Sequence, residues 1–275
     1  MLVLRLGFIP LADSEHLRAE VDAFAAALST AMGDTVRPLF APNYQSLLTS
    51  LEQNIAQIAW VPPVIAARAV RSGVVLPAAV ALRGGASSYA TALFSRSGAP
   101  FSNAQDLERV RAGWVDKQSA GGYLVIRAAL VEAGVDVERA FADESFLGTH
   151  EAVARAVLDR KIDVGATYVT YHPGTKSVAR AGWREVGGDD EFRVVTQAGP
   201  IPADFFGVHK SLAGARVELL QRALVDGSPV AARAAAMTLF QTDGFVRPTD
   251  EHKAALEGLL ANVDSVRSRS PSRQA

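Results

Sequence analysis

The stretch QIAWVPP, residues 57–63, holds the pattern that decides the fold class. Gln57–Val61 is short and almost continuously apolar, which is typical of a strand buried on both faces of a sheet. Pro62 and Pro63 follow at once, and proline is well suited to the first turn of a helix. The stretch therefore predicts a buried strand that leads directly into a helix at Val64–Arg71, which is the repeating unit of an α/β protein.

The same alternation of strand and helix extends along the chain in both directions. Apolar residues recur at helical spacing in 17–32, and Gly33 follows where a helix commonly ends. The expected strands are Leu2–Ile9, Thr35–Phe40, Gln57–Val61, Val74–Leu82, Ala90–Ser95, Ala112–Val115, Ile162–Val169 and Phe192–Thr196. The expected helices are 17–32, 44–53, 64–71, 103–109, 122–132, 150–160, 216–226, 230–240 and 250–263. Apolar strands separated by helices predict parallel sheets covered on both faces.

Length and chain breaks predict two lobes. The 275 residues correspond to about two domains at about 150 residues each. Gly199–Pro202 is a strong break, and Tyr89–Ser95 and Phe192–Thr196 are candidate crossing strands. We expect lobe I at 1–90 and 200–263, lobe II at 91–199, and a disordered tail at 264–275, where SVRSRSPSRQA has no apolar anchor. A cleft between two such lobes is the default ligand site.

Composition excludes several classes of function. Lys and Arg number 28 against 29 Asp and Glu, so the net charge of −1 argues against a nucleic-acid partner. Cysteine is absent, which excludes disulfides, thiolate catalysis and Cys-ligated metals. His150-Glu151 begins like a zinc-protease motif, but Ala154 stands where the second histidine belongs. We therefore expect no metal, no cofactor and no nucleic acid.

The ends of the chain and its apolar runs bear on location. No apolar run reaches the roughly 18 residues of a membrane span, so we expect no direct membrane insertion. Met1–Leu6 lacks the features of a signal peptide. The location is therefore cytoplasmic if Met1 is the natural start, and periplasmic or extracytoplasmic if a leader has been removed.

Three local features carry possible chemistry. Asp116–Tyr123 lies between a strand and a helix, where small residues and helix N-terminal amides favour an anion. Gly148–Ala152 places His150 at a second helix start, and Pro200–Asp204 combines rigid prolines with a carboxylate. Taken alone, each feature fits an ordinary structural role at least as well as a functional one. These roles are a tight turn, a solvent-facing first-turn residue and a surface turn, respectively.

Taken in order, these segments resemble the phosphonate/phosphite/phosphate-binding family, the substrate-binding components of ABC transporters with the type II periplasmic-binding fold. The resemblance extends from Leu4 to about Val263. It is carried by Leu4–Pro10, Asn43-Tyr44, Ile58–Pro63, Ser88-Tyr89, Gly122-Tyr123, Gly148–Ala152, Ile162–Ala166 and Pro200–Asp204. The implied fold has two lobes, each a mostly parallel sheet flanked by helices, with two crossing strands as the hinge.

The resemblance also implies a ligand site. Tyr44 is expected to reach the ligand from the first lobe and Tyr89 from the first crossing strand. The loop and helix start that hold the anion comprise Gln118, Ser119, Ala120, Gly121, Gly122 and Tyr123. His150 is expected to donate to the same anion. Asp204 is expected to accept from an ammonium group or from a protonated ligand oxygen, because a carboxylate repels a fully ionised ligand.

The loop departs from the family pattern, which has several Ser or Thr residues ending in Ser-Gly. Here Ser119 is followed by Ala120 and Gly121, so at least two side-chain donors are missing. Each hydrogen bond to a charged group contributes roughly 1.5–3 kcal/mol. Backbone amides or Gln118 can compensate. A carboxylate or another small polar solute therefore remains an open alternative to a phosphonate.

The leading hypothesis is a non-enzymatic, monomeric protein that binds a small anion or zwitterion and serves an ABC permease or a sensor protein. The alternative is a cytoplasmic enzyme on the same fold, similar to the menaquinone-pathway enzymes that eliminate water from chorismate. In that case His150 or Asp204 would act as acid or base. A third class with this fold, the effector domains of transcription regulators, requires a helix-turn-helix segment that we do not expect here.

Overall fold

The computed structural model describes residues 2–9, 15–172, 174–175, 177–212 and 214–269. The chain divides into two compact units. Unit 1 comprises Met1–Ser88 and Pro202–Glu257, and unit 2 comprises Tyr89–Ile201 and Gly258–Ala275. The sequence places the limits at residues 90 and 199, and these units divide at 88 and 201. Residues 258–263, expected in lobe I, are assigned to unit 2.

Unit 1 is built on a six-stranded mixed sheet in the order β12-β4-β11-β3-β1-β2. Its strands are β1 (Val3–Phe8), β2 (Thr35–Phe40), β3 (Ile58–Val61), β4 (Val75–Leu82), β11 (Phe205–His209) and β12 (Gly244–Val246). β1 pairs in parallel with β2 and β3, whereas β11 runs antiparallel between β3 and β4. The α/β class is as expected, and the sheet is mixed because a buried apolar run does not reveal the direction of its strand.

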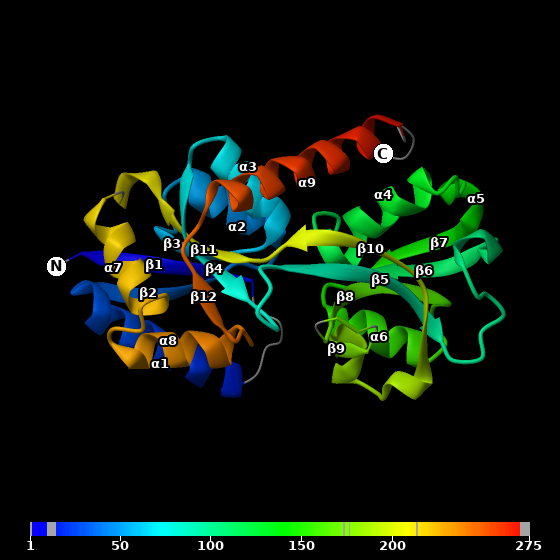
Figure 1. The fold of residues 1–275 in the computed structure, drawn as a ribbon, viewed down its shortest axis with the longest axis horizontal. Helices are drawn as coiled ribbons and strands as arrows, with labels where there is room; N and C mark the ends of the chain where they lie inside the picture. The colour runs from blue at the N-terminus through cyan, green and yellow to red at the C-terminus, as the bar shows by residue number, and fades with distance from the viewer. Residues whose placement is uncertain (1, 10–14, 173, 176, 213, 270–275) are drawn as a thin grey trace. The chain divides into compact units, whose positions relative to one another are not determined.

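Helices cover both faces of this sheet. They are α1 (Glu15–Met32), α2 (Tyr44–Glu52), α3 (Pro63–Arg71), α7 (Ala215–Leu224) and α8 (Val230–Leu239), with the short 3-10 turn η5 at Lys210–Leu212. In Figure 1, α1 and α8 lie on one face of the sheet and α2 and α3 on the other. The helix at Pro63 begins as expected, because proline at the first turn loses no hydrogen bond.

An aromatic cluster fills the core of unit 1. The Trp60 ring stacks on Phe240 at 4.3 Å between centroids, and Phe206 meets both rings edge-on at 5.1 and 5.2 Å. Phe24 closes the cluster at 5.6 Å from Phe206. Trp60, Phe206 and Phe24 belong to β3, β11 and α1, and Phe240 directly follows α8. They therefore tie the returning segment after residue 202 to the N-terminal part of the chain.

Unit 2 contains a second mixed sheet in the order β10-β5-β8-β6-β7, with β9 paired to β8. Its strands are β5 (Ser88–Arg96), β6 (Val110–Trp114), β7 (Phe141–Phe146), β8 (Val164–Tyr171), β9 (Val178–Ala181) and β10 (Phe192–Pro202). β5 runs antiparallel to β8, and β6 runs parallel to both β7 and β8. Alternate residues of β5 enter two separate cores: Phe94 packs in one and Leu93 in the other.

The helices of unit 2 are shorter. They are α4 (Val125–Glu132), α5 (Val137–Ala140) and α6 (His150–Leu158), with a π-helical turn η2 at Ala120–Leu124 and 3-10 turns η1 (Ala104–Asp106), η3 (Gly182–Glu185) and η4 (Asp189–Glu191). A last helix, α9 (Asp250–Arg269), is divided between the units at Glu257 and Gly258. Across the described part of the chain, no helix has the length and apolarity to cross a bilayer.

Several expectations from the sequence are wrong. The helix expected at 103–109 is limited to the 3-10 turn η1, and Leu107 is already extended. The break expected at Gly199–Pro202 is continuous strand, because β10 is the edge strand of its sheet and proline at an edge forfeits no ladder bond. The disorder expected from residue 264 gives way to helix α9 as far as Arg269. Asp250 and Glu251 stabilise the first turn because acidic side chains interact favourably with a helix N-terminus. No proline, which would interrupt the helix, occurs in the sequence from 250 to 269. Residues 270–275 of the expected tail lie outside the described residues.

Candidate ligand-binding site

The loop that follows β6 closes on itself before the chain turns into helix. The Asp116 Oδ1 atom accepts from the Gln118 amide at 2.7 Å, and the Ser119 hydroxyl accepts from the Gly122 amide at 3.0 Å. The Leu124 amide then reaches back five residues to the Ser119 carbonyl at 2.9 Å, which defines the π-helical turn η2. Turns of this kind are rare and are frequent at functional sites. The helix expected at Gly122 therefore begins earlier, at Ala120.

Two glycines allow this turn to pack tightly. A Cβ atom at Gly122 would lie 2.4 Å from Val115 Cγ2, and one at Gly121 would lie 3.1 Å from Cε2 of the Tyr89 ring. The Gly121 carbonyl accepts from the Thr91 hydroxyl at 2.6 Å, which ties the turn to β5. A hydroxyl-bearing side chain at residue 121, as in the family pattern, would therefore require Tyr89 to move.

Ser119 has a structural role within the turn. Its hydroxyl accepts a backbone hydrogen bond and its side chain is 2% exposed. Serine at this position therefore caps the π-helical turn. The Ser119 hydroxyl keeps one proton to donate, and the backbone amides and the half-buried Gln118 are further donors in this loop.

His150 is the first residue of α6, and two other residues, Thr149 and Gly165, help to position it. The Thr149 hydroxyl accepts from the Ala152 amide at 3.0 Å and caps the helix as expected. Gly165 on β8 lets the helix approach the sheet, because a Cβ atom there would lie 2.5 Å from Val153 Cγ1. The His150 ring lies edge-on to Tyr168 at 5.0 Å, and its Nδ1 atom lies 2.9 Å from the Thr167 hydroxyl.

The protonation state of His150 follows from its surroundings. Its side chain is half-buried in accessible area, and its ring is packed closely by protein. Burial lowers the pKa of His150 to about 4, from an ordinary value of 6.5. The ring is therefore neutral near pH 7. It can act toward a ligand as a hydrogen-bond donor without carrying a positive charge.

The structure brings three of the expected residues together around one that the sequence analysis missed. Tyr168 lies opposite Thr91 in the pairing of β5 with β8. The Tyr168 Cα atom is 3.7 Å from the place of a Cβ atom at Gly121, and its ring contacts His150. Tyr89 covers Gly121 from the same strand as Thr91. Gly121 and His150 thus both lie against Tyr168 within unit 2, and Tyr89 lies against Gly121.

The Tyr123 side chain packs among other aromatic residues beside the loop. Its ring packs between Trp114 at 5.4 Å and Phe146 at 5.1 Å, and the Arg127 guanidinium lies 5.6 Å above it. The Lys117 ammonium lies over Phe146 at 5.6 Å. The Tyr123 side chain is therefore part of an aromatic cluster beside the loop.

Tyr44 and Asp204 lie in unit 1. Tyr44 is the first residue of α2, half-buried, beside the capping residue Asn43. The Asp204 carboxylate forms an ion pair with Arg83 at 3.1 Å, and both side chains are mostly buried. Arg83 also donates to the Phe240 carbonyl at 3.1 Å and lies 5.9 Å over the Trp60 ring. The carboxylate that was expected to face a ligand with its full charge is thus compensated by a protein cation.

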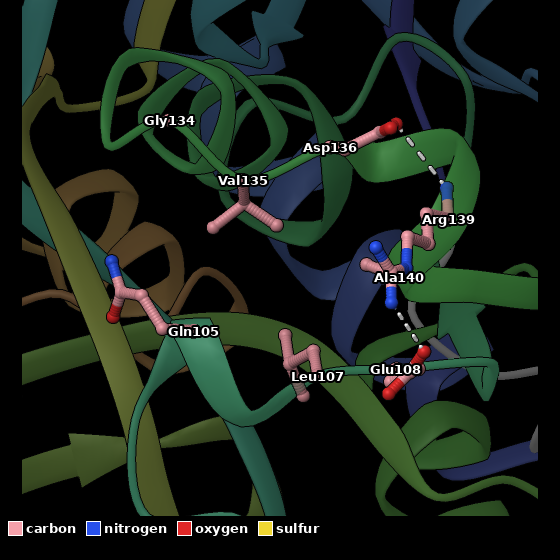
Figure 2. A pocket seen from close by; sticks show the side chains of 8 residues that line it. All are labelled: Gln105, Leu107, Glu108, Gly134, Val135, Asp136, Arg139 and Ala140. Atoms are coloured by element: carbon pink, nitrogen blue, oxygen red, sulfur yellow. Dashed lines mark hydrogen bonds and ion pairs between the residues drawn. The ribbon is translucent and has the colours of Figure 1, made fainter.

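A surface pocket of about 320 Å³ lies elsewhere in unit 2, and none of the expected site residues lines it. Figure 2 shows its wall, formed by Gln105, Leu107, Glu108, Gly134, Val135, Asp136, Arg139 and Ala140. The exposed ion pair between Arg139 and Glu108, at 2.8 Å, lies at its rim. No cluster of three or more His, Asp or Glu residues suited to a metal occurs among residues that the structure describes.

Comparisons with known proteins place this chain among transport proteins. The family described as "ABC transporter, phosphonate, periplasmic substrate-binding protein" matches residues 6–252. Curated protein sequences include no match. Three solved structures share the fold at low identity, and each covers nearly the whole of both chains.

XAC2383 from Xanthomonas citri, bound to ATP, is 21% identical over 97% of this chain and 98% of its own, with a TM-score of 0.75. PA3383 from Pseudomonas aeruginosa, a binding protein component of an ABC phosphonate transporter, is 20% identical over 99% of both chains, with a TM-score of 0.72. PhnD1 from Prochlorococcus marinus, in complex with methylphosphonate, is 12% identical over 95% and 98%, with a TM-score of 0.76. With a family match that spans most of its length, this chain belongs to the periplasmic substrate-binding proteins of phosphonate ABC transporters.

Proposed function

We propose that this chain binds a small phosphorus oxyanion of the phosphonate, phosphite or phosphate class and releases it unchanged. The observation that carries the proposal is the convergence of the glycine-rich turn η2 and the N-terminal residue of α6 on Tyr168. Helix N-termini present backbone amides to anions, and a neutral His150 adds a side-chain donor. Among the structural relatives, XAC2383 is bound to ATP and PhnD1 to methylphosphonate, and both ligands are phosphorus oxyanions.

The Arg83–Asp204 pair refines the expected preference for a protonated ligand. A carboxylate without a cation would repel a dianion, whereas Asp204 shares its charge with Arg83. We therefore expect the protein to accept the fully ionised form of its ligand. Tyr44 and Asp204 enter the proposal through the family resemblance, and the ligand contact of Tyr44 is tested by its own variant below.

The bound protein is proposed to act as a monomer that delivers its ligand to an ABC permease or to a sensor protein. The comparisons lend no support to the alternative of an enzyme similar to chorismate dehydratase, and we propose no catalytic step. Light scattering with and without ligand tests the monomeric state. A stable dimer in both conditions would contradict it.

The first test is thermal stability against a panel of ligands: phosphate, phosphite, methylphosphonate, 2-aminoethylphosphonate, sulfate and several carboxylates including chorismate. A ligand at 100 times its Kd stabilises the folded state by about 2.7 kcal/mol. For a chain of this size the gain raises Tm by roughly 5–10 °C. A shift with a phosphorus oxyanion supports the proposal, and a shift with carboxylates alone, or with no member of the panel, contradicts it.

The second test compares site variants by calorimetric titration with the best ligand of that panel. Removing one hydrogen bond to a charged ligand should weaken affinity by about 10- to 100-fold. We expect such a loss for His150→Gln, and for Tyr44→Phe if the Tyr44 hydroxyl contacts the ligand. His16→Gln is the matched control, because the His16 side chain is 84% exposed. Unchanged affinity in both site variants would show that the residues inherited from the family are the wrong ones.

A further inference from the structure

A buried threonine lies behind the His150 ring. Thr167 on β8 is fully buried, and its hydroxyl oxygen is 2.9 Å from Nδ1 of His150. The space for this pair depends on Gly182, the first residue of η3. A Cβ atom at Gly182 would lie 2.0 Å from the Thr167 hydroxyl oxygen and 3.0 Å from the His150 Cβ atom. Three elements, β8, α6 and η3, therefore meet at this hydroxyl–imidazole contact.

A count of protons fixes the direction of this hydrogen bond. A threonine hydroxyl has one proton to donate, and a neutral imidazole has one N–H group. Within the described part of the chain, Nδ1 of His150 is the hydrogen-bond partner of the Thr167 hydroxyl, and no buried side-chain nitrogen or oxygen lacks a partner. If Nδ1 carried the ring proton, the hydroxyl proton would be buried without an acceptor, which is unfavourable. The hydroxyl therefore donates to Nδ1.

This direction leaves the ring proton on Nε2. The edge-on contact with Tyr168, at 5.0 Å and 80° between ring planes, holds the plane of the imidazole. The Nε2 atom has no hydrogen-bond partner among the residues that the structure describes. Because burial keeps the pKa of His150 near 4, the ring has a single N–H group near pH 7, and that group is available to an acceptor outside the protein.

We propose that Thr167 is a positioning residue for ligand binding, which donates its hydroxyl proton to Nδ1 of His150 and so directs the ring's own N–H group, on Nε2, toward an anionic oxygen. The ligand part of this inference rests on the proposed function. The tautomer part does not, because it concerns the ligand-free protein. The residue acts through His150 and does not itself touch the ligand.

The first experiment measures the tautomer directly. Protein labelled with nitrogen-15 in its histidine rings is studied without ligand at pH 7 by long-range proton–nitrogen NMR, and His150→Gln identifies the signals of residue 150. We expect Nδ1 of His150 to resonate as an unprotonated, hydrogen-bonded nitrogen and Nε2 as a protonated one. A proton on Nδ1, or an even mixture of the two tautomers, would overturn the proposal whether or not the protein binds a phosphonate.

The second experiment separates the hydroxyl from the shape of the side chain. Thr167→Val removes the hydroxyl and keeps the branched shape, whereas Thr167→Ser keeps the hydroxyl. In titrations with methylphosphonate we expect Thr167→Val to lose about tenfold in affinity and Thr167→Ser to stay within about threefold of the parent. The same NMR measurement should show mixed tautomers in Thr167→Val and the parent tautomer in Thr167→Ser.

A purely structural role for Thr167 predicts a different pattern. Both variants would then lower Tm, and neither would change the tautomer of His150. That result, or equal affinities for parent and Thr167→Val, would overturn the inference. If the parent binds no member of the ligand panel, the proposed function fails, and the NMR comparison of the parent with Thr167→Val still decides the role of Thr167. If Thr167→Val does not fold, the tautomer of His150 measured in the parent still tests the proposal.

Discussion

Two candidate ligand residues, Asp204 in unit 1 and His150 in unit 2, are satisfied in opposite ways. In unit 1 the Asp204 carboxylate is paired with Arg83, whose guanidinium also donates to backbone carbonyls and lies over Trp60. In unit 2 the His150 ring is uncharged, and one of its nitrogens is held by Thr167. The charge of Asp204 is used in an ion pair within its own unit. The neutral His150 ring uses only Nδ1 for its hydrogen bond to Thr167, so Nε2 can donate to a ligand. Under the proposed function, we therefore expect the stronger anion contacts to come from unit 2.

The largest expected effect concerns acid. Between pH 6.5 and pH 4 the unfolded chain binds a proton at residue 150 that the folded protein does not, because the folded pKa of His150 is about 4. The free energy of unfolding should therefore fall as the pH falls through this window, by up to about 3 kcal/mol. Burial also lowers the pKa of His209, which adds to the slope in the same direction.

Urea unfolding at closely spaced pH values measures this slope. His150→Gln should flatten the part that belongs to residue 150, and His16→Gln should leave the slope unchanged because its side chain is exposed. Equal slopes in the parent and His150→Gln would mean that the His150 ring is not buried neutral, and the contrast between the two units would be lost.

The next effect concerns the ion pair of unit 1. Arg83→Met leaves the Asp204 carboxylate without its cation, and that carboxylate is only 19% exposed. The cost should be about 2–3 kcal/mol, because an unpaired buried charge is unfavourable. The double variant with Asp204→Asn should recover part of this loss. If the double variant is no more stable than Arg83→Met, the Arg83 side chain contributes through its packing on Trp60 and not through its charge.

A smaller effect is expected at the π-helical turn. Gly122→Ala would place a methyl group 2.4 Å from Val115 Cγ2, and overpacking of this kind should cost about 1–2 kcal/mol. Ligand affinity should fall with it, because the turn must shift. Gly258→Ala is the matched control. Gly258 lies in α9, and a Cβ atom added there would have open space around it to 4 Å, so alanine should be neutral or slightly stabilising. Chemical denaturation and ligand titration of both variants check this expectation, and equal effects in the two would contradict it.

The smallest effect is expected at the pocket in Figure 2. Arg139 and Glu108 form an ion pair in which the side chains are 72% and 62% exposed. Exposed pairs contribute little, so Arg139→Ala should change the free energy of unfolding by about 0.5 kcal/mol or less. The same measurement on Arg83→Met provides the contrast between a solvated pair and a buried one. A loss at Arg139 as large as that at Arg83 would remove that contrast.

Local signals in the sequence predicted much of the fold. Thr35–Phe40 has the predicted limits as β2, and the cap at Thr149 is the one expected for α6. Gly33 ends α1 with a φ of +68°, a conformation that glycine adopts without strain. These features depend on neighbours within a few residues. A single sequence is therefore sufficient to find them.

Strands without a local apolar signal were not predicted. β7 is an edge strand, and most of its residues are exposed and polar, so it resembles a loop. β11 is fully buried but only five residues long, and it follows a proline-rich segment that suggested a break. Its place between β3 and β4 depends on partners more than 100 residues away in the chain, with Phe206 opposite both Trp60 and Ala79. No local pattern indicates such pairing.

The residues of the candidate site also fall into two groups: those that the sequence indicated and those that only the structure reveals. The resemblance supplied the expected positions, including Tyr89, Gly121 and His150. It did not indicate Thr91, Thr167 or Tyr168, which lie on strands whose inward polar residues look like ordinary strand residues in the sequence. It also did not indicate that Arg83 neutralises Asp204, because these two residues are separated by 121 positions.

The sequence by itself determined the α/β alternation, the helix caps and the family, because these depend on periodicity, on short-range hydrogen bonds and on motifs in a constant order. Only the tertiary structure decided which groups are charged, buried or open to a ligand. The state of His150 depends on its burial and on Thr167, and the state of Asp204 depends on Arg83. Electrostatic energies and pKa values are set by distances in space, and residues far apart in the chain provide those distances.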